Sequence, residues 1–326
     1  MTSQLDMFGV TQPLASTAAP TRKRPRPLAK ALLTLEDDEA LAAHLEGTGR
    51  YRILRKLEPK PVVDNPRPGF PHIAVIVDTE TTGLKKAEDE IIEIGLIAIR
   101  FNEVGQVGDV IGTYGALQAP SRPIPADITA LTGIDDAMVL GQSINLRAVE
   151  DMVASADLII AHNAAFDRPF CERLSPEFAS KAWACSNAEI DWKARGFEGS
   201  KLGYLVSQAG YFHDGHRALD DCFALLAVLD RQDADARSAF AELFASSQKA
   251  RVRLWAEYSP FDKKDVLKAR GYRWSSGDDG GPKAWWTEVD AEDLDAEVRY
   301  LQTDIYQRAD VEPTTRYLTA MERFKA

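Results

Sequence analysis

Cysteine is scarce in this sequence, and no two cysteines lie in a metal-binding spacing. Cys171, Cys185 and Cys222 are the three present, and none belongs to a Cys-x-x-Cys motif. A zinc site or a disulfide framework is therefore not expected. Unpaired cysteines fit a reducing compartment, so we expect a cytoplasmic protein.

Long apolar runs and an excess of basic residues are also missing. No run reaches the ~20 apolar residues that span a membrane. Residues 1–20 lack the charged start and long apolar centre of a secretory signal, so none is expected. The net charge of −11 disfavours non-specific coating of nucleic acid. Nucleic acid would have to be bound at local basic or metal sites.

The remaining pattern divides the 326 residues into six segments. It predicts a disordered tail (1–33), a small helix–strand segment with a linker (34–70), an α/β domain (71–232), a helical or flexible linker (233–250), a Trp-rich α+β domain of order βαββα (251–308) and a C-terminal tail (309–326). In the α/β domain, three strands at hairpin spacing precede strands that alternate with helices. This order predicts a mixed sheet with helices on both faces.

One strand of that sheet ends in two acids. The apolar run Ile73–Val77 is typical of a buried strand and is followed by Asp78 and Glu80. Side chains two positions apart on a strand leave the same face, so both carboxylates point into one small volume. Their repulsion favours a divalent cation between them. A solvated acidic turn is the alternative for this stretch alone.

Two later segments bring more acids of the right kind. The apolar strand 158–161 leads to Asp167 at the start of a helix, where it could instead interact with the helix dipole. Asp221 begins a strongly apolar helix, and spacing favours it over Asp220 as a ligand. His216 lies in the loop ahead and can accept a proton at neutral pH, although a lone loop histidine is often structural.

Taken together, these motifs resemble those of a known enzyme family. Asp78-x-Glu80, Asp167 in His-Asn-x-x-Phe-Asp, and His216-x4-Asp221 are similar to the three motifs of the DEDDh 3′–5′ exonucleases. Among these, the proofreading epsilon subunits of bacterial DNA polymerase III are most similar. Thr79, residues 81–84 and the segment 124–133 add to the match, which spans about residues 73–230.

The resemblance implies a ribonuclease H-like fold and a two-metal site. Two Mg²⁺ or Mn²⁺ ions about 3.5–4 Å apart would be held by Asp78, Glu80, Asp167 and Asp221. His216 would be the general base. Leu84 and Phe166 would stack on or wedge the terminal bases, and backbone groups of Thr81, Thr82 and Gly83 would contact the terminal nucleotide. The products would be nucleoside 5′-monophosphates released from a 3′ end.

The N-terminal segment carries two further features. Residues Gln4, Leu5, Asp6, Met7 and Phe8 are similar to the Gln-Leu-x-Leu-Phe peptide with which bacterial DNA enzymes bind the sliding clamp, and Met7 replaces a leucine. Its apolar side chains would fill a groove on the clamp. An ordinary tail sequence is the alternative. The basic run Arg22–Arg26 could contact phosphates, act as a nuclear signal in a eukaryote, or only aid solubility.

The segment 251–308 combines four tryptophans with several basic residues. Flat aromatics interleaved with cations suit single-stranded or forked nucleic acid. The alternative is that the tryptophans form the core of a small domain, and we expect this for at least two of them.

Our leading hypothesis is a bacterial, metal-dependent 3′–5′ DNA exonuclease of replication or repair. It would act on 3′ ends, chiefly single-stranded, and the Trp-rich extension favours a stand-alone enzyme. An RNA 3′ exonuclease is the alternative enzyme, because the same four acids serve ribonucleases of the family. A clamp- or DNA-binding adaptor with a vestigial nuclease site is the alternative from another class.

Overall fold

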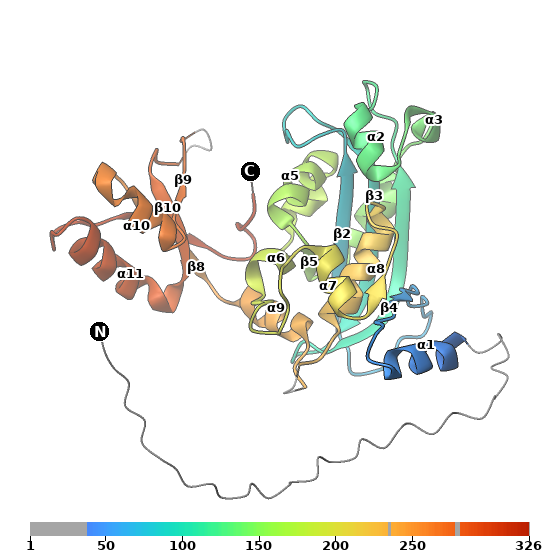
Figure 1. The fold of residues 1–326 in the computed structure, drawn as a ribbon. Coiled ribbons are helices and arrows are strands. Elements are labelled where there is room, and N and C mark those ends of the chain that lie inside the picture. The colour runs from blue at the N-terminus through green and yellow to red at the C-terminus, as the bar shows by residue number, and fades with distance from the viewer. Residues whose placement is uncertain (1–37, 234–235, 278–280, 326) are drawn as a thin grey trace, which may run out of the picture. The chain divides into compact units, whose positions relative to one another are not determined.

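The structure is a computed structural model that describes residues 38–233, 236–277 and 281–325 (Figure 1). The predicted tail 1–33, with the peptide at residues 4–8 and the basic run at 22–26, lies outside the described residues. The chain divides into two units, residues 1–53 and 54–326. The described part of the first contains helix α1 (Asp38–Gly47). No helix in the described ranges has the length and apolarity to cross a membrane.

The second unit contains the predicted mixed sheet. Its strand order is β4-β3-β2-β5-β6, from β2 (His72–Thr81), β3 (Ile91–Phe101), β4 (Val107–Leu117), β5 (Leu158–Ala161) and β6 (Trp183–Cys185). Strands β2, β3 and β4 pair antiparallel, with Gly105 in the turn between β3 and β4 at φ 72°, whereas β5 and β6 add in parallel. The predicted fold class is thus confirmed.

Helices cover both faces of this sheet because β2 and β3 are apolar on both sides. One face packs against α7 (Leu202–Gln208), α8 (Ala218–Leu229) and α9 (Ala239–Gln248), and the other against α4 (Leu146–Ala154) and α5 (Ala164–Leu174). The remaining elements are α2 (Ala126–Thr132), α3 (Asp136–Val139), α6 (Ser186–Glu189), the 3-10 helix Pro176–Ser180, and the short parallel pair β1 (Arg55–Lys56) and β7 (Tyr211–Phe212).

The segment expected to be a helical or flexible linker, 233–250, contains α9, and this helix packs into the core of the α/β domain. Phe240 and Leu243 are fully buried in the same core cluster as α8. Ser238 caps the helix by accepting a hydrogen bond from the Ala241 amide at 3.1 Å. Burial of these apolar side chains makes α9 part of the α/β domain.

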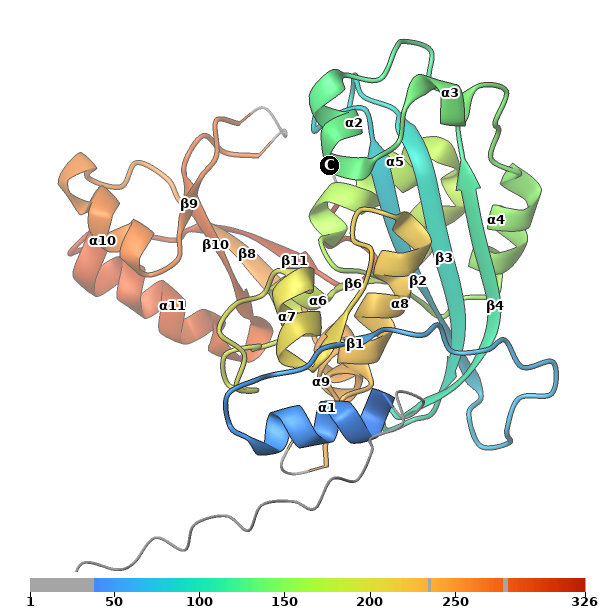
Figure 2. The same cartoon turned by 45° about the vertical axis from the view of Figure 1, so that its right-hand side comes forward.

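A second, smaller sheet follows (Figure 2), with strand order β11-β8-β10-β9. Its strands are β8 (Arg251–Ala256), β9 (Arg273–Trp274), β10 (Trp285–Asp290) and β11 (Thr314–Leu318). Its core is closed by α10 (Lys264–Ala269) and by α11 (Leu294–Tyr300), which continues as a π-helix (Leu301–Ile305), with 3-10 turns at Phe261–Lys263 and Ala291–Asp293. The predicted order βαββα therefore agrees with β8, α10, β9, β10 and α11, and it lacks only β11.

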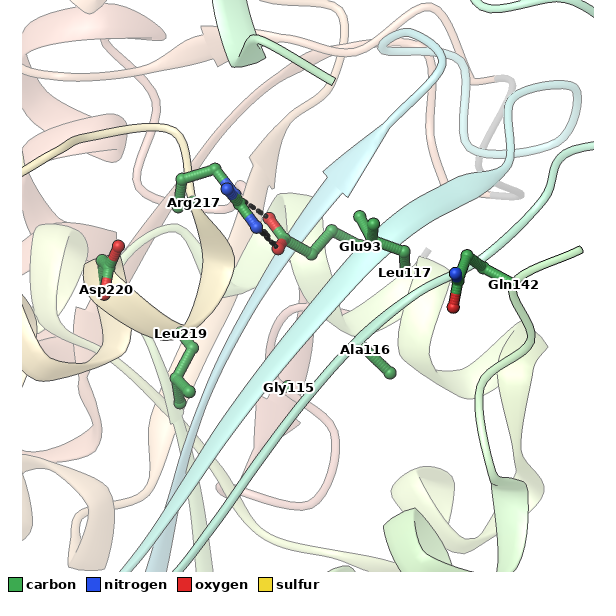
Figure 3. Close-up of a pocket in the computed structure, with 8 residues that line it drawn as sticks. All are labelled: Glu93, Gly115, Ala116, Leu117, Gln142, Arg217, Leu219 and Asp220. Carbon is green, nitrogen blue, oxygen red and sulfur yellow. Dashed lines mark hydrogen bonds and ion pairs between the residues drawn. The ribbon is translucent and has the colours of Figure 1, made fainter. Parts of the chain in front are cut away.

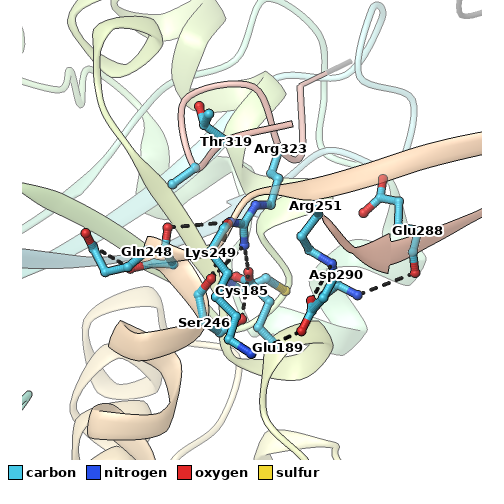
Figure 4. A network of polar contacts seen from close by, with 12 residues as sticks. Cys185, Glu189, Ser246, Gln248, Lys249, Arg251, Glu288, Asp290, Thr319 and Arg323 are labelled. Atoms are coloured by element: carbon cyan, nitrogen blue, oxygen red, sulfur yellow. Dashed lines mark hydrogen bonds and ion pairs between the residues drawn. The ribbon is translucent and has the colours of Figure 1, made fainter. Parts of the chain in front are cut away.

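Residues 309–326 were expected to be a tail, but their described part, 309–325, completes this sheet and returns to the α/β domain. β11 pairs with β8, and the chain then brings Arg323 beside Glu189, where both side chains are 1% exposed (Figure 4). Arg168 on α5 is fully buried and donates to the carbonyls of Arg323 at 2.6 Å and Met321 at 2.8 Å. Buried guanidinium groups need such acceptors, which is why this segment is fixed.

Candidate active site

Asp78 and Glu80 share one side of β2 because side chains alternate along a strand. Ala74 and Ile76 pack into the core cluster that contains α8. Asp78 and Glu80 have the same parity and continue this row past the apolar segment. The predicted common face of the two acids follows directly from this register.

Helix α8 reaches these acids because β3 has a glycine opposite Asp78. Gly95 pairs with Asp78, and a Cβ on it would lie 2.4 Å from the backbone of Ala218 at the start of α8. Glycine therefore permits an approach that any larger residue would block. As a result, one carboxylate oxygen from each of Asp78, Glu80 and Asp221 lies within 4.8 Å of the others.

Asp167 lies beside this group. It sits in the first turn of α5 and is 3% exposed. Thr79 holds it, since both the Thr79 amide (3.2 Å) and its hydroxyl (2.9 Å) donate to Asp167 Oδ1. Within the described residues, the group of acids whose oxygens lie within 4.8 Å of one another has three members, and Asp167 is not among them.

The acids perturb one another strongly. Burial raises the pKa of Asp78 well above its usual range, and repulsion from Asp167 and Asp221 raises it further. Burial, followed by repulsion from Asp221 and Glu93, raises the pKa of Glu80 to about 8. Burial also raises the pKa of Asp167, against the two hydrogen bonds from Thr79. Such shifts in neighbouring groups are typical of functional sites.

Two histidines flank Asp221, and sequence reasoning named one of them. His216 is exposed at φ 65°, and its amide donates to Asp221 Oδ2 at 2.8 Å. The imidazole that contacts Asp221 belongs to His213, whose Nε2 lies 2.7 Å from Oδ1. No pattern in the sequence distinguished His213, because a histidine eight residues before a helical acid has no fixed relation to it.

A second group missed from the sequence is the ion pair between Glu93 and Arg217 (Figure 3). Glu93 is 6% exposed and accepts from the Arg217 guanidinium at 2.8 Å and from the Ala218 amide at 3.0 Å. It therefore fixes the start of α8. The pair lines a pocket of about 490 Å³ that also includes Leu117, Gln142, Leu219 and Asp220. Glu93 was overlooked because it lies within a strand that otherwise reads as apolar.

The predicted substrate residues fall into two kinds. Thr81 and Thr82 are buried, and their hydroxyls hydrogen-bond to Gly83 and Asp89, so they shape the turn itself. Leu84 is 80% exposed just beyond that turn. Phe166 is half-buried and packs on Phe170, with ring centroids 5.0 Å apart. Of the predicted apolar contacts, Leu84 is the more accessible.

The donor set suits a hard divalent cation. Asp78, Glu80 and Asp221 offer only carboxylate oxygens, the ligands that Mg²⁺ and Mn²⁺ prefer. Their mutual repulsion is relieved by a cation placed between them. These residues therefore fit a divalent metal, and the neighbouring Asp167 could supply a further carboxylate ligand.

Comparisons with known proteins agree with this geometry. A family model described as "Exonuclease" matches residues 75–229. The epsilon subunit of DNA polymerase III from Treponema pallidum is 34% identical over 174 residues, which are 48% of this chain and 77% of that protein. A PolC-type DNA polymerase III from Thermotoga petrophila is 31% identical over 166 residues, and the chain spans 11% of its length.

A solved structure titled as Exonuclease X in complex with 5′ overhanging duplex DNA is also similar. It is 24% identical, the match covers 52% of this chain and 99% of that one, and the TM-score is 0.37.

Proposed function

The chain belongs to the exonuclease family that its residues 75–229 match, and from this premise we propose that it is a metal-dependent 3′–5′ exonuclease acting on DNA. The products would be nucleoside 5′-monophosphates, and the setting would be replication or repair in a bacterial cytoplasm. The observation that carries this proposal is the group of three carboxylates from two elements within 4.8 Å.

Each acid has a position that suits its role. Asp78, Glu80 and Asp221 would hold the metal together with Asp167, whose Oδ1 is fixed by hydrogen bonds from the Thr79 amide and hydroxyl. When bound, two Mg²⁺ or Mn²⁺ ions would supply an activated water and stabilise the leaving 3′ oxygen. Leu84, exposed beside the turn, would stack on the terminal base.

His216 is our candidate for the general base. Its imidazole is exposed, so it is accessible to water and to a 3′ end, whereas His213 is 9% exposed and engaged with Asp221. We assign His213 to positioning Asp221. His216→Asn should lower kcat by roughly 10²-fold or more. His213→Asn should chiefly weaken Mg²⁺ binding. If His213→Asn lowered kcat and His216→Asn weakened Mg²⁺ binding, the two histidines would have the opposite roles.

The substrate class is tested with matched oligonucleotides. Single-stranded DNA, duplex DNA and RNA of the same sequence should be offered with Mg²⁺, with Mn²⁺ and with EDTA. We expect degradation from the 3′ end of single-stranded DNA, and none with EDTA. A strong preference for RNA would replace the DNA proposal with a ribonuclease.

The site is tested with Asp78→Asn. Loss of this ligand should reduce Mg²⁺-dependent hydrolysis by about 10⁴-fold, because the metal site then lacks a central oxygen. Asp220→Asn is the matched control, since Asp220 adjoins Asp221 but lies outside the group of acids. Full activity of Asp78→Asn would reject this assignment of the active site. An absence of hydrolysis in the wild-type protein would instead support the alternative of a clamp- or DNA-binding adaptor.

We also propose that residues 4–8 tether the enzyme to a sliding clamp. The support is the similarity of Leu5, Met7 and Phe8 to the clamp-binding peptide. Deletion of residues 1–9 should abolish co-elution with purified clamp and leave hydrolysis of short oligonucleotides unchanged. Undiminished co-elution would reject the tether.

A further inference from the structure

The small sheet exposes large aromatic side chains at one end. Tyr258 is 98% exposed, Phe261 is 80% exposed and Trp274 is 53% exposed. Tyr258 also has a φ of 55°, which is rare for a non-glycine residue, and it lies two residues after the end of β8. Exposed aromatics gathered in one place are typical of binding surfaces.

Strand register places these residues near one another. Ala256, the last residue of β8, pairs with Trp285, which pairs in turn with Trp274 on the edge strand β9. Neighbouring strands are about 4.8 Å apart, so the end of β8 and Trp274 are separated by about 10 Å. Tyr258 follows β8 directly, and Phe261 opens the turn that leads into α10.

Cations accompany these aromatics. Lys264 Nζ lies 4.2 Å from the ring centroid of Phe261. Trp274 packs edge-on against Trp285, with ring centroids 5.7 Å apart, and Trp285 packs on the core cluster that contains Leu267 of α10, so Trp274 and α10 lie on the same side of the sheet. Arg273 adjoins Trp274 on β9, and its side chain leaves the opposite face, 5.7 Å from the ring of Trp286.

Arg251, Arg253 and Arg270 of this region pair with Asp290, Glu288 and Glu297. Lys263 and Lys268 accompany Lys264 in the segment that follows Phe261, against Asp262 and Asp265. Lysines therefore lie beside the exposed aromatics.

We propose that Tyr258, Phe261, Trp274 and Lys264 form a binding platform for single-stranded DNA. Bases would stack on the three aromatic rings, and a phosphate would contact Lys264. Exposed rings beside a lysine offer both the stacking surface and the phosphate contact that a single strand uses, which favours a nucleic acid over a protein partner. That the strand is DNA rather than RNA rests on the proposed function.

The test measures binding without hydrolysis. The full chain in EDTA is titrated against a fluorescein-labelled oligothymidylate of about 20 nucleotides, longer than one small module covers. Trp274→Ala and Phe261→Ala should each weaken binding at least about fivefold. Lys264→Gln should also reduce the slope of log Kd against log salt by about 0.7. Tyr317→Ala is the matched control, because Tyr317 is 61% exposed on β11 at the other edge of the same sheet.

Two further readouts separate this proposal from the nuclease proposal. Hydrolysis of the p-nitrophenyl ester of thymidine 5′-monophosphate should be unchanged in the platform variants, because this substrate is too small to reach the platform. Phe261→Ala removes a side chain that is 80% exposed, so a folding defect cannot account for its result. Equal binding by the wild type, Trp274→Ala and Phe261→Ala would overturn the platform. Tighter platform-dependent binding of oligouridylate would overturn its assignment to DNA.

Discussion

Two groups of charged side chains are withdrawn from water in this molecule, and they are built in opposite ways. At the end of β2, Asp78, Glu80 and Asp221 place like charges within 4.8 Å of one another. Between α6 and the returning C-terminal segment, Glu189 and Arg323 form an ion pair in which both side chains are 1% exposed. The first group accumulates charge of one sign, whereas the second cancels it.

The difference shows which group is structural. Arg323 also donates to the carbonyls of Ser246 and Lys249, so it has acceptors within the chain (Figure 4). The acids at the end of β2 instead raise the pKa of one another and gain from a cation that the chain does not supply. The three acids, whose charges no basic side chain of the group neutralises, are therefore the candidates for function.

The largest effect on stability should come from breaking the ion pair between Glu189 and Arg323. Arg323→Ala leaves Glu189 buried without its partner, so the free energy of unfolding should fall by about 3–5 kcal/mol in urea titrations. Arg316→Ala, in the same segment but exposed, should change it by less than about 0.5 kcal/mol. Equal stability of the two variants would show that the ion pair does not hold this segment.

A smaller effect on stability should follow from a substitution that separates Asp221 from Asp78 and Glu80. Gly95→Ala introduces a Cβ that meets the backbone of α8, and overpacking of this kind costs about 1–3 kcal/mol. Displacement of α8 moves Asp221 away from Asp78, so Mg²⁺ affinity and kcat should both fall. Gly112→Ala on β4 is the control, because its nearest neighbour is the end of the Met152 side chain at 3.4 Å. A Gly95→Ala enzyme with normal Mg²⁺ affinity would contradict this account.

The effect that is smallest over a single pH unit is a pH dependence of the metal-free protein. Glu80 has a pKa of about 8 in the folded state against 4.5 ordinarily, so between these values the folded state binds a proton that the unfolded state has lost. Stability should therefore fall as pH rises from 4.5 to 8, by up to about 1.4 kcal/mol per pH unit.

Two measurements sharpen this prediction. Mg²⁺ should restore stability, and more so at higher pH, because it replaces the protons on the carboxylates. Glu80→Gln should flatten the pH dependence seen in urea titrations. Stability that rose with pH over this range would contradict the repulsion among the acids.

The sequence predicted the elements whose patterns are local. The apolar run before Asp78, the alternation that sets Asp78 and Glu80 on one face, and the helices that begin near Asp167 and Asp221 all depend on neighbouring residues. The expectation that at least two tryptophans of the small domain are core residues also agrees with the structure, since Trp255 is 4% exposed and Trp285 packs in the core.

The missed features depend on residues far apart in the chain. Gly95 matters because of a helix that starts at Ala218, and Arg168 is satisfied by carbonyls more than 150 residues later. β11 was not predicted because it is only five residues long and four of these residues are exposed. These residues form a strand because they pair with β8, and not because of a local sequence pattern. Such contacts leave no periodicity in the sequence.

The position of Arg168 limits how this protein can be dissected. Arg168 follows Asp167 on α5, and the acceptor that it reaches at Arg323 lies 155 positions downstream. A fragment that ends near residue 250 would keep every candidate ligand and the ion pair of Arg168 with Glu172, but it would lose the three backbone carbonyls to which the Arg168 guanidinium donates. Truncation there would therefore remove contacts that hold the helix presenting Asp167, and the activity of the fragment would not represent that of the intact enzyme.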